Sequence, residues 1–124
     1  MMKRVTGIGG IFFKSEQPEV LAAWYEKHLG IQLSPYMSGT VFESNGQTVW
    51  TLFPKDTQYF APSTAPFMVN YRVENLLELV KVLREEGVEV VDTVEDPEYG
   101  KFAWVMDPEG NRIELWEPPV QETE

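Results

Sequence analysis

The chain has no cysteine and a single histidine among its 124 residues. Without cysteine there is no disulfide scaffold, no thiolate metal site and no thiol nucleophile. No apolar run approaches the roughly 18 residues needed to cross a bilayer. The basic N-terminus is not followed by the apolar stretch of a signal peptide. We therefore expect a soluble, cytoplasmic protein that does not bind membranes.

Basic residues are also scarce. Ten Lys and Arg residues stand against 20 Asp and Glu residues, which gives a formal net charge of −10. A surface of that sign repels phosphate backbones, so we expect no nucleic-acid partner. No acidic run is long enough to indicate a dedicated basic partner, and the charge is read as a source of solubility.

The chain is rich in the apolar residues that form a folded core, with 43% hydrophobic and 13% aromatic residues. Residues 5–53 read as a strand, a helix and three short strands. Pro18 suits the first turn of the helix, Leu21, Tyr25 and Leu29 form its apolar stripe, and Gly30 ends it. The three strands are expected near residues 31–35, 39–44 and 47–53, the last two separated by the hairpin signal Asn45-Gly46.

Residues 66–116 repeat this order of elements after a linker at 54–65. Residues 67–73 alternate like a half-buried strand. Asn75 with Glu78 predicts a capping box at the start of a helix, and Gly87 predicts its end. Three further strands are expected at residues 88–91, 102–106 and 112–116, followed by a polar tail at 119–124. The sequence therefore predicts two tandem βαβββ units in an α+β fold.

Two stretches carry a family resemblance. Residues 24–30 read Trp-Tyr-Glu-Lys-His-Leu-Gly, and residues 107–115 read Asp-Pro-Glu-Gly-Asn-Arg-Ile-Glu-Leu. Inside the duplicated pattern they resemble the vicinal oxygen chelate superfamily, which includes glyoxalase I, extradiol dioxygenases, methylmalonyl-CoA epimerase and the bleomycin and fosfomycin resistance proteins. The resemblance covers residues 5–118 as a single domain. It implies curved sheets around a cavity, with the helices outside. A dimeric ferredoxin-like protein is the alternative fold.

The resemblance also implies four metal-ligand positions on the inner face, which fall on Gly10, Trp50, Met68 and Glu114. Only Glu114 suits a hard divalent cation. A register shift of two residues offers Asn70 in place of Met68 and still supplies no imidazole. We therefore expect no metal and no other cofactor. The single histidine, His28, is expected to be solvated at the end of the first helix, away from the cavity.

Strand alternation places one set of side chains toward the cavity. Along the strand at 112–116, Ile113 and Leu115 are expected to pack on the helix, with Glu114 and Trp116 on the other face. The candidate ligand-binding residues are Phe12, Lys14, Trp50, Leu52, Met68, Asn70, Arg72, Glu114 and Trp116. The alternative is that the aromatic residues only fill a core, and that Glu114 is a structural carboxylate paired with Arg112, Arg72 or Lys14.

Two function classes follow. The first is a binding protein of the bleomycin-resistance type that holds a small organic ligand, with Glu114 orienting a donor group. The second is a metal-independent or atypical-metal lyase, isomerase or dioxygenase-type enzyme with Glu114 as catalytic base. The resemblance also implies a homodimer. The loops at 59–62 and 96–100 are candidates for covering the cavity mouth and equally for plain surface connections.

Overall fold

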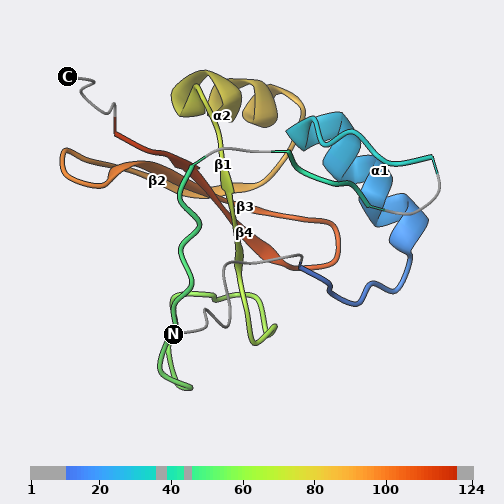
Figure 1. Cartoon of the computed structure of the whole chain (residues 1–124), viewed down its shortest axis with the longest axis horizontal. Helices are drawn as coiled ribbons and strands as arrows, with labels where there is room; N and C mark the ends of the chain where they lie inside the picture. Colours follow the sequence, from blue (N-terminus) through green and yellow to red (C-terminus); the bar gives the residue numbers. More distant parts are fainter. Residues whose placement is uncertain (1–10, 36–38, 44–45, 120–124) are drawn as a thin grey trace, which may run out of the picture.

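The computed structural model describes residues 11–35, 39–43 and 46–119. Figure 1 shows two helices and one sheet of four strands in this part of the chain. No helix of these residues is long and apolar enough to cross a membrane. The elements in chain order are α1 (Pro18–Leu29), β1 (Val69–Arg72), α2 (Leu76–Glu85), β2 (Val90–Asp96), β3 (Gly100–Met106) and β4 (Arg112–Glu117).

The sheet has the order β1-β4-β3-β2, so the first and last strands of the second half lie side by side. β1 pairs with β4 in parallel, and β4, β3 and β2 are joined by antiparallel pairs. A short turn, and no helix, connects β3 to β4. The second half is therefore one βαβββ unit with a mixed sheet, as the sequence predicts for residues 66–116.

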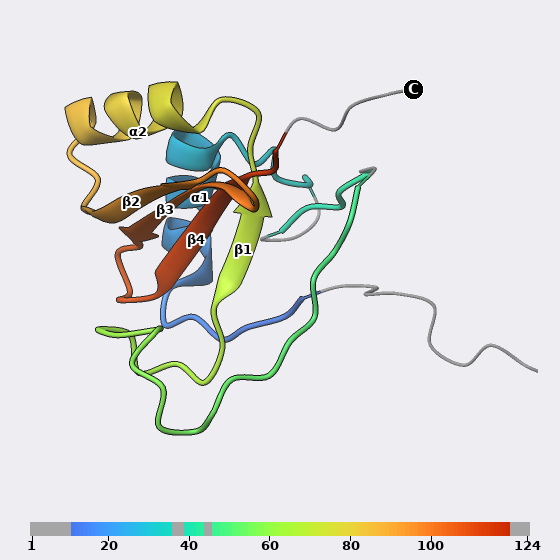
Figure 2. The ribbon, with the colours of Figure 1, turned by 90° about the vertical axis from the view of Figure 1, so that its left-hand side faces the viewer.

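Both helices pack on the same face of this sheet. Leu21 and Tyr25 from α1 join Val80 and Leu83 from α2 in one buried cluster, over the inward side chains of β3 and β4. Those inward side chains are Ala103, Val105, Ile113 and Leu115, each at most 1% exposed. Figure 2 shows the helices gathered on one side of the strands. Among the described residues, the opposite face carries no helix.

Helix α1 begins and ends where its sequence predicts. Pro18 is its first residue, and Gly30 follows its last residue with φ of 69°. This left-handed conformation favours glycine, because a Cβ would be strained there. The helix belongs to the first half of the chain, yet its buried residues contact the sheet of the second half. The two halves are thus joined through α1.

The capping box predicted for α2 is present only in altered form. The Asn75 amide donates to Oε2 of Glu78 (3.0 Å) and makes no bond to the helix backbone. The backbone N–H of Leu76 is bound by Oε1 of Glu117 at 2.9 Å. A carboxylate from the end of β4 therefore does the capping, because the sheet brings it next to the helix start.

The βαβββ unit predicted for the first half, residues 5–53, does not form in the residues that the structure describes, so this prediction is wrong there. No strand forms within 11–14, 31–35, 39–43 or 46–53, and residues 6–10 of the expected first strand lie outside the described ranges. Figure 2 shows the segment around residue 50 running past β1 without joining the sheet. A strand requires a backbone partner. The described structure provides none there, so Val49 (70% exposed) and Leu52 (79% exposed) stay on the surface.

Two smaller expectations also differ. The strand predicted at 88–91 is β2, which begins at Val90 and continues to Asp96. His28 is not solvated: its side chain is 9% exposed and its Nδ1 lies 2.9 Å from Oε1 of Glu86. This contact ties the end of α1 to the residue that follows α2, on the helix side of the sheet.

Candidate functional site

The helix-free face of the sheet, which we call the open face, gathers polar and aromatic side chains in rows across the strands. In one row Asn70 of β1 pairs with Glu114 of β4, which pairs with Trp104 of β3. In the next row Arg72, Trp116 and Phe102 are neighbours in the same order. Because side chains alternate along a strand, all six leave the sheet on the side away from the core. Four of the nine predicted site residues, Asn70, Arg72, Glu114 and Trp116, are brought together here.

Glu114 is held by two neutral donors. The Tyr59 hydroxyl donates to its Oε1 (2.7 Å), and the Asn70 amide donates to its Oε2 (3.2 Å). Of the structural partners considered for Glu114, which were Arg112, Arg72 and Lys14, Arg112 forms no ion pair with it and donates to the carbonyl of Ala61 at 2.7 Å. A carboxylate fixed by side-chain donors on an exposed face is suited to orienting a ligand's donor group.

Tyr59 is not among the predicted site residues, although its loop at 59–62 was a candidate for covering the cavity mouth, and its contact with Glu114 was not predicted. Burial and the Glu114 carboxylate raise its pKa to about 12, against smaller opposing effects of Trp104 and Arg112. The phenol therefore keeps its proton near neutral pH and acts as a hydrogen-bond donor. The only sequence signal was an aromatic residue among prolines and polar residues, and that does not identify a partner 55 positions away.

Three aromatic rings stand in parallel beside Glu114. Phe102 is stacked with Trp104 at a centroid distance of 6.2 Å and with Trp116 at 6.3 Å, and the interplanar angles are 12° and 13°. The Trp116 indole N–H donates to the carbonyl of Tyr99 at 2.8 Å, which fixes its ring. Phe102 and Trp116 are partly exposed and Trp104 is 7% exposed, and aligned rings of this kind offer flat apolar area at little cost in side-chain entropy.

Arg112 lies at one end of this surface. Its Cζ is 5.3 Å from the Trp104 ring centroid and 6.0 Å from that of Tyr59. A guanidinium over an aromatic face is held by the ring quadrupole. The Arg112 cation is therefore directed at the rings rather than at Glu114. The open face thus carries a positive and a negative side chain, Arg112 and Glu114, on the same strand.

The remaining predicted site residues do not join the open face. Phe12 is 94% exposed, Trp50 71% and Leu52 79%, so they pack against almost nothing. Lys14 is exposed as well, and Met68 lies half-buried just before β1. Arg72 contacts the first half, because its guanidinium donates to the carbonyl of Gln47. The predicted cavity between two sheets is thus absent from the described residues.

The motif at 107–111 has a structural role that the sequence reading did not assign. Oδ2 of buried Asp107 accepts from the Tyr25 hydroxyl of α1 (2.8 Å) and from the Asn111 amide (2.7 Å). Its Oδ1 accepts from the backbone N–H groups of Glu109 and Asn111, both at 2.9 Å. One carboxylate closes the β3–β4 turn and clamps α1 to it. Burial, and then Asp107, raise the pKa of Tyr25 far above its ordinary value.

Glu109 of the same turn holds the start of α1. It accepts from the Ser15 hydroxyl (2.6 Å) and from the backbone N–H groups of Glu16 (2.9 Å) and Gln17 (3.3 Å). These hydrogen bonds, that from Ser15 first, lower the pKa of the Glu109 carboxyl. The motif therefore sets the register of β4, and so the position of Glu114, against the helix layer.

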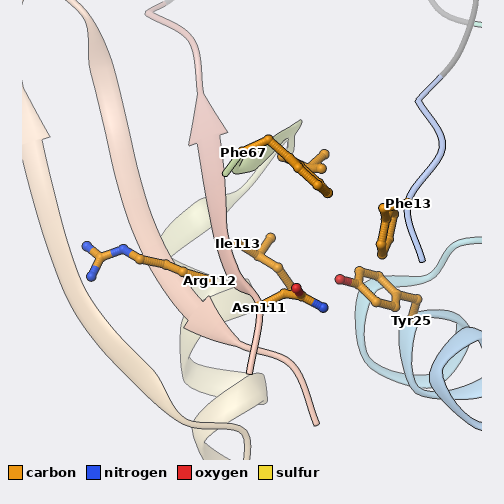
Figure 3. Close-up of a pocket in the computed structure, with 7 residues that line it drawn as sticks. Phe13, Tyr25, Phe67, Asn111, Arg112 and Ile113 are labelled. Atoms are coloured by element: carbon orange, nitrogen blue, oxygen red, sulfur yellow. The ribbon is translucent and has the colours of Figure 1, made fainter. Parts of the chain in front are cut away.

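Two hollows lie on the helix side, and neither resembles a ligand site. The first holds about 10 Å³, room for about one water molecule. Figure 3 shows its residues, with the Tyr25 hydroxyl directed toward Asn111, and Arg112 pointing away across the strand. The second, about 200 Å³, lies between the start of α1 and the β3–β4 turn. Small-molecule sites usually occupy about 300 Å³ or more.

The donor set does not fit a catalytic divalent metal. Gly10 lies outside the described residues, Trp50 is exposed, and Met68 offers only a thioether, so Glu114 stands alone among the four implied positions. In the part of the chain that the structure describes, no three His, Cys, Asp or Glu side chains converge on one point. Magnesium, manganese and zinc need several oxygen or imidazole donors.

A sequence model described as the Glyoxalase/Bleomycin resistance protein/Dioxygenase superfamily matches residues 11–115 of this chain. No curated protein matches it. Among solved structures, a glyoxalase family protein from Enterococcus faecalis is 29% identical, with a TM-score of 0.39 over 52% of each chain. Trypanothione-dependent glyoxalase I from Leishmania major is 28% identical, with a TM-score of 0.35 over 54% of this chain and 41% of that one.

A third structure, an integron cassette protein from the mobile metagenome of V. cholerae, is 18% identical with a TM-score of 0.43, over 77% of this chain and 82% of that one. The alignments with the first two structures span about half or less of those chains. Because all three TM-scores are below 0.5, the family assignment depends on the sequence match to residues 11–115.

Proposed function

This chain belongs to the Glyoxalase/Bleomycin resistance protein/Dioxygenase superfamily, and from that premise we propose that it binds a small organic ligand on the open face. The observation that carries the proposal is the position of Glu114. Its carboxylate is oriented by Tyr59 and Asn70, beside a row of three parallel aromatic rings. A few placed polar groups next to apolar area are what small-molecule recognition requires.

Binding is favoured over catalysis by the hydrogen bonds of the carboxylate. Both oxygens of Glu114 already accept from a neutral donor. A general base must lie within hydrogen-bond reach of the proton that it removes. The Tyr59 hydroxyl holds Oε1 of Glu114, and the Arg112 cation is bound to the carbonyl of Ala61 and lies over the rings of Tyr59 and Trp104, so a base role for Glu114 requires Tyr59 to move before a substrate reaches either group. We therefore assign Glu114 the task of orienting the ligand.

A thermal-shift screen with small aromatic probes of different charge tests this proposal. We expect at least one of p-cresol, benzylamine, benzoate and toluene to raise the melting temperature of the wild-type protein, and Glu114→Gln or Trp116→Ala to reduce that rise. Glu98→Gln is the matched control, because Glu98 is an exposed carboxylate on the β2–β3 turn. A probe whose effect is the same in Glu114→Gln as in wild type binds elsewhere and contradicts the proposal.

We further propose a homodimer. Both sheet edges, β1 and β2, lack a neighbouring strand within the described ranges. Val41, Val49 and Trp50 of the first half are at least 70% exposed. Open edges and exposed apolar groups are liabilities that association covers. A second copy that covers residues 41–43 and 46–53 would also supply the open face with the second wall that the described residues do not provide.

A further inference from the structure

The residues at 54–65, which we call the Tyr59 loop, lie over one end of the open face. The loop is attached to the sheet by two hydrogen bonds, from the Tyr59 hydroxyl to Glu114 (2.7 Å) and from Arg112 to the carbonyl of Ala61 (2.7 Å). Its ring stands edge-on to Trp104, at a centroid distance of 6.0 Å and an angle of 89°. The protein's own phenol is thus seated on three side chains of the sheet: Glu114, Trp104 and Arg112.

This attachment is weak by comparison with the core. No residue of the Tyr59 loop belongs to the buried cluster between sheet and helices, and Tyr59 remains 37% exposed. Its other ring contacts, with Phe53 and Phe60, are to the loop itself and the residue before it. A loop held by few buried contacts opens at low free-energy cost. Tyr59 is therefore able to leave Glu114 while the βαβββ unit stays folded.

A second feature of the site points to an occupant other than Tyr59. Trp104 is 7% exposed, and its indole N–H is buried without a hydrogen-bond partner among the described residues. The Trp104 side chain lowers the pKa of Tyr59, yet its N–H makes no hydrogen bond to the Tyr59 oxygen. A buried donor left unpaired costs free energy. The site is completed by an oxygen that accepts a hydrogen bond from the Trp104 N–H.

The polar groups discriminate between ligand classes. A hydroxyl is able to donate to Glu114 and at the same time accept from the Trp104 N–H. An ammonium group has no lone pair to accept with, and it would also meet the Arg112 guanidinium. A carboxylate would be repelled by Glu114. A neutral hydroxyl on an aromatic ring satisfies all of these groups.

We propose that Tyr59 is an internal occupant of a phenol subsite, and that the phenolic ring of a ligand replaces it on Glu114 and Trp104. This rests on the function proposed above, and it names the ligand class. The Tyr59 loop then competes with the ligand, so the apparent dissociation constant equals the intrinsic one divided by the fraction of molecules with the loop open.

Titration calorimetry with p-cresol tests the competition through the direction in which one substitution changes the dissociation constant. Tyr59→Phe removes the hydroxyl that closes the loop and keeps the ring, so p-cresol should bind roughly tenfold more tightly than to wild type. Tyr59→Ala should also bind p-cresol more tightly than wild type. Tyr99→Phe, which removes an exposed phenol hydroxyl on the β2–β3 turn, should bind as wild type does. Circular dichroism checks that each variant is folded.

The choice of probes separates this inference from the proposed function. In Tyr59→Phe, toluene and benzylamine should bind much more weakly than p-cresol, and adding Glu114→Gln should remove the preference for the hydroxyl. Equal or weaker p-cresol binding by Tyr59→Phe, or no p-cresol binding by any variant, overturns the phenol subsite. If benzylamine or benzoate then binds wild type and is lost in Glu114→Gln, the proposed function stands alone. If Glu114→Gln alters no probe, both are wrong.

Discussion

Replacing Tyr25 with phenylalanine removes a single hydroxyl from the contact that joins α1 to the β3–β4 turn. That hydroxyl donates to Oδ2 of Asp107 at 2.8 Å, and Asp107 is 5% exposed. The ring is unchanged, so its packing against Phe13 and Trp24 is preserved. The substitution therefore tests one hydrogen bond between residues 82 positions apart.

The expected loss is about 2 kcal/mol in the free energy of unfolding, because a hydrogen bond to a charged group contributes about 1.5–3 kcal/mol. The carboxylate of Asp107 keeps its three other donors, which limits the loss to the lower half of that range. For a chain of this length such a loss lowers the melting temperature by roughly 8 °C.

Urea denaturation monitored by circular dichroism measures this change. The midpoint should fall in Tyr25→Phe while the slope of the transition stays constant, because the surface exposed on unfolding is the same. Tyr71→Phe is the matched control, since its ring lies 6.2 Å from that of Tyr25 and its hydroxyl has no hydrogen-bond partner among the described residues. Equal midpoints for the two variants would refute the clamp between α1 and the turn.

Three further predictions follow from the same contacts and from the open face. Burial raises the pKa of Tyr71 to about 12, and that of Tyr25 still further, from an ordinary value of 10.0. The folded protein therefore keeps protons that the unfolded chain loses, so the contribution of these tyrosines to stability is constant below pH 10 and falls above it, by about 1.4 kcal/mol per pH unit for each retained proton. Tyr25→Phe should show a shallower fall in melts between pH 9 and 12, and a slope equal to that of wild type would contradict the assignment. Purified protein should carry no stoichiometric divalent metal. A chelator should leave its melting temperature unchanged, because metal bound only to the folded state would raise it. If elemental analysis finds a full equivalent of metal that is lost in Glu114→Gln, the ligand positions are misassigned. Light scattering at micromolar concentration should return a dimer mass, and Trp50→Glu should shift it toward the monomer; a monomer mass for wild type would defeat the proposed pairing.

The site divides into parts that local pattern predicts and parts that it does not. Strand alternation alone places Glu114 and Trp116 opposite Ile113 and Leu115, and the sheet register confirms this. The same rule places Asn70 and Arg72 on the open face. Tyr59 escaped prediction, because no periodicity links a loop residue to a strand 55 positions later. Its place depends on how the loop crosses the sheet.

The sequence by itself determined the elements whose signals lie within a few residues. Pro18 and Gly30 mark the ends of α1, Gly87 follows the end of α2, and the run at 107–111 marks the β3–β4 turn. These signals act through fixed backbone angles, missing N–H groups and short-range hydrogen bonds, which act whatever the rest of the chain does.

Only the tertiary structure decided which extended segments become strands and which distant residues the motif side chains bind. Residues 47–53 have the composition of a strand, yet a strand exists only where another backbone pairs with it, and among the described residues the sheet ends at β1. Asp107 was read only as part of the stretch that carries the family resemblance, and its carboxylate accepts a hydrogen bond from a helix of the other half of the chain. Pairing and burial are properties of distant residues brought together, so they emerge only when the chain is folded.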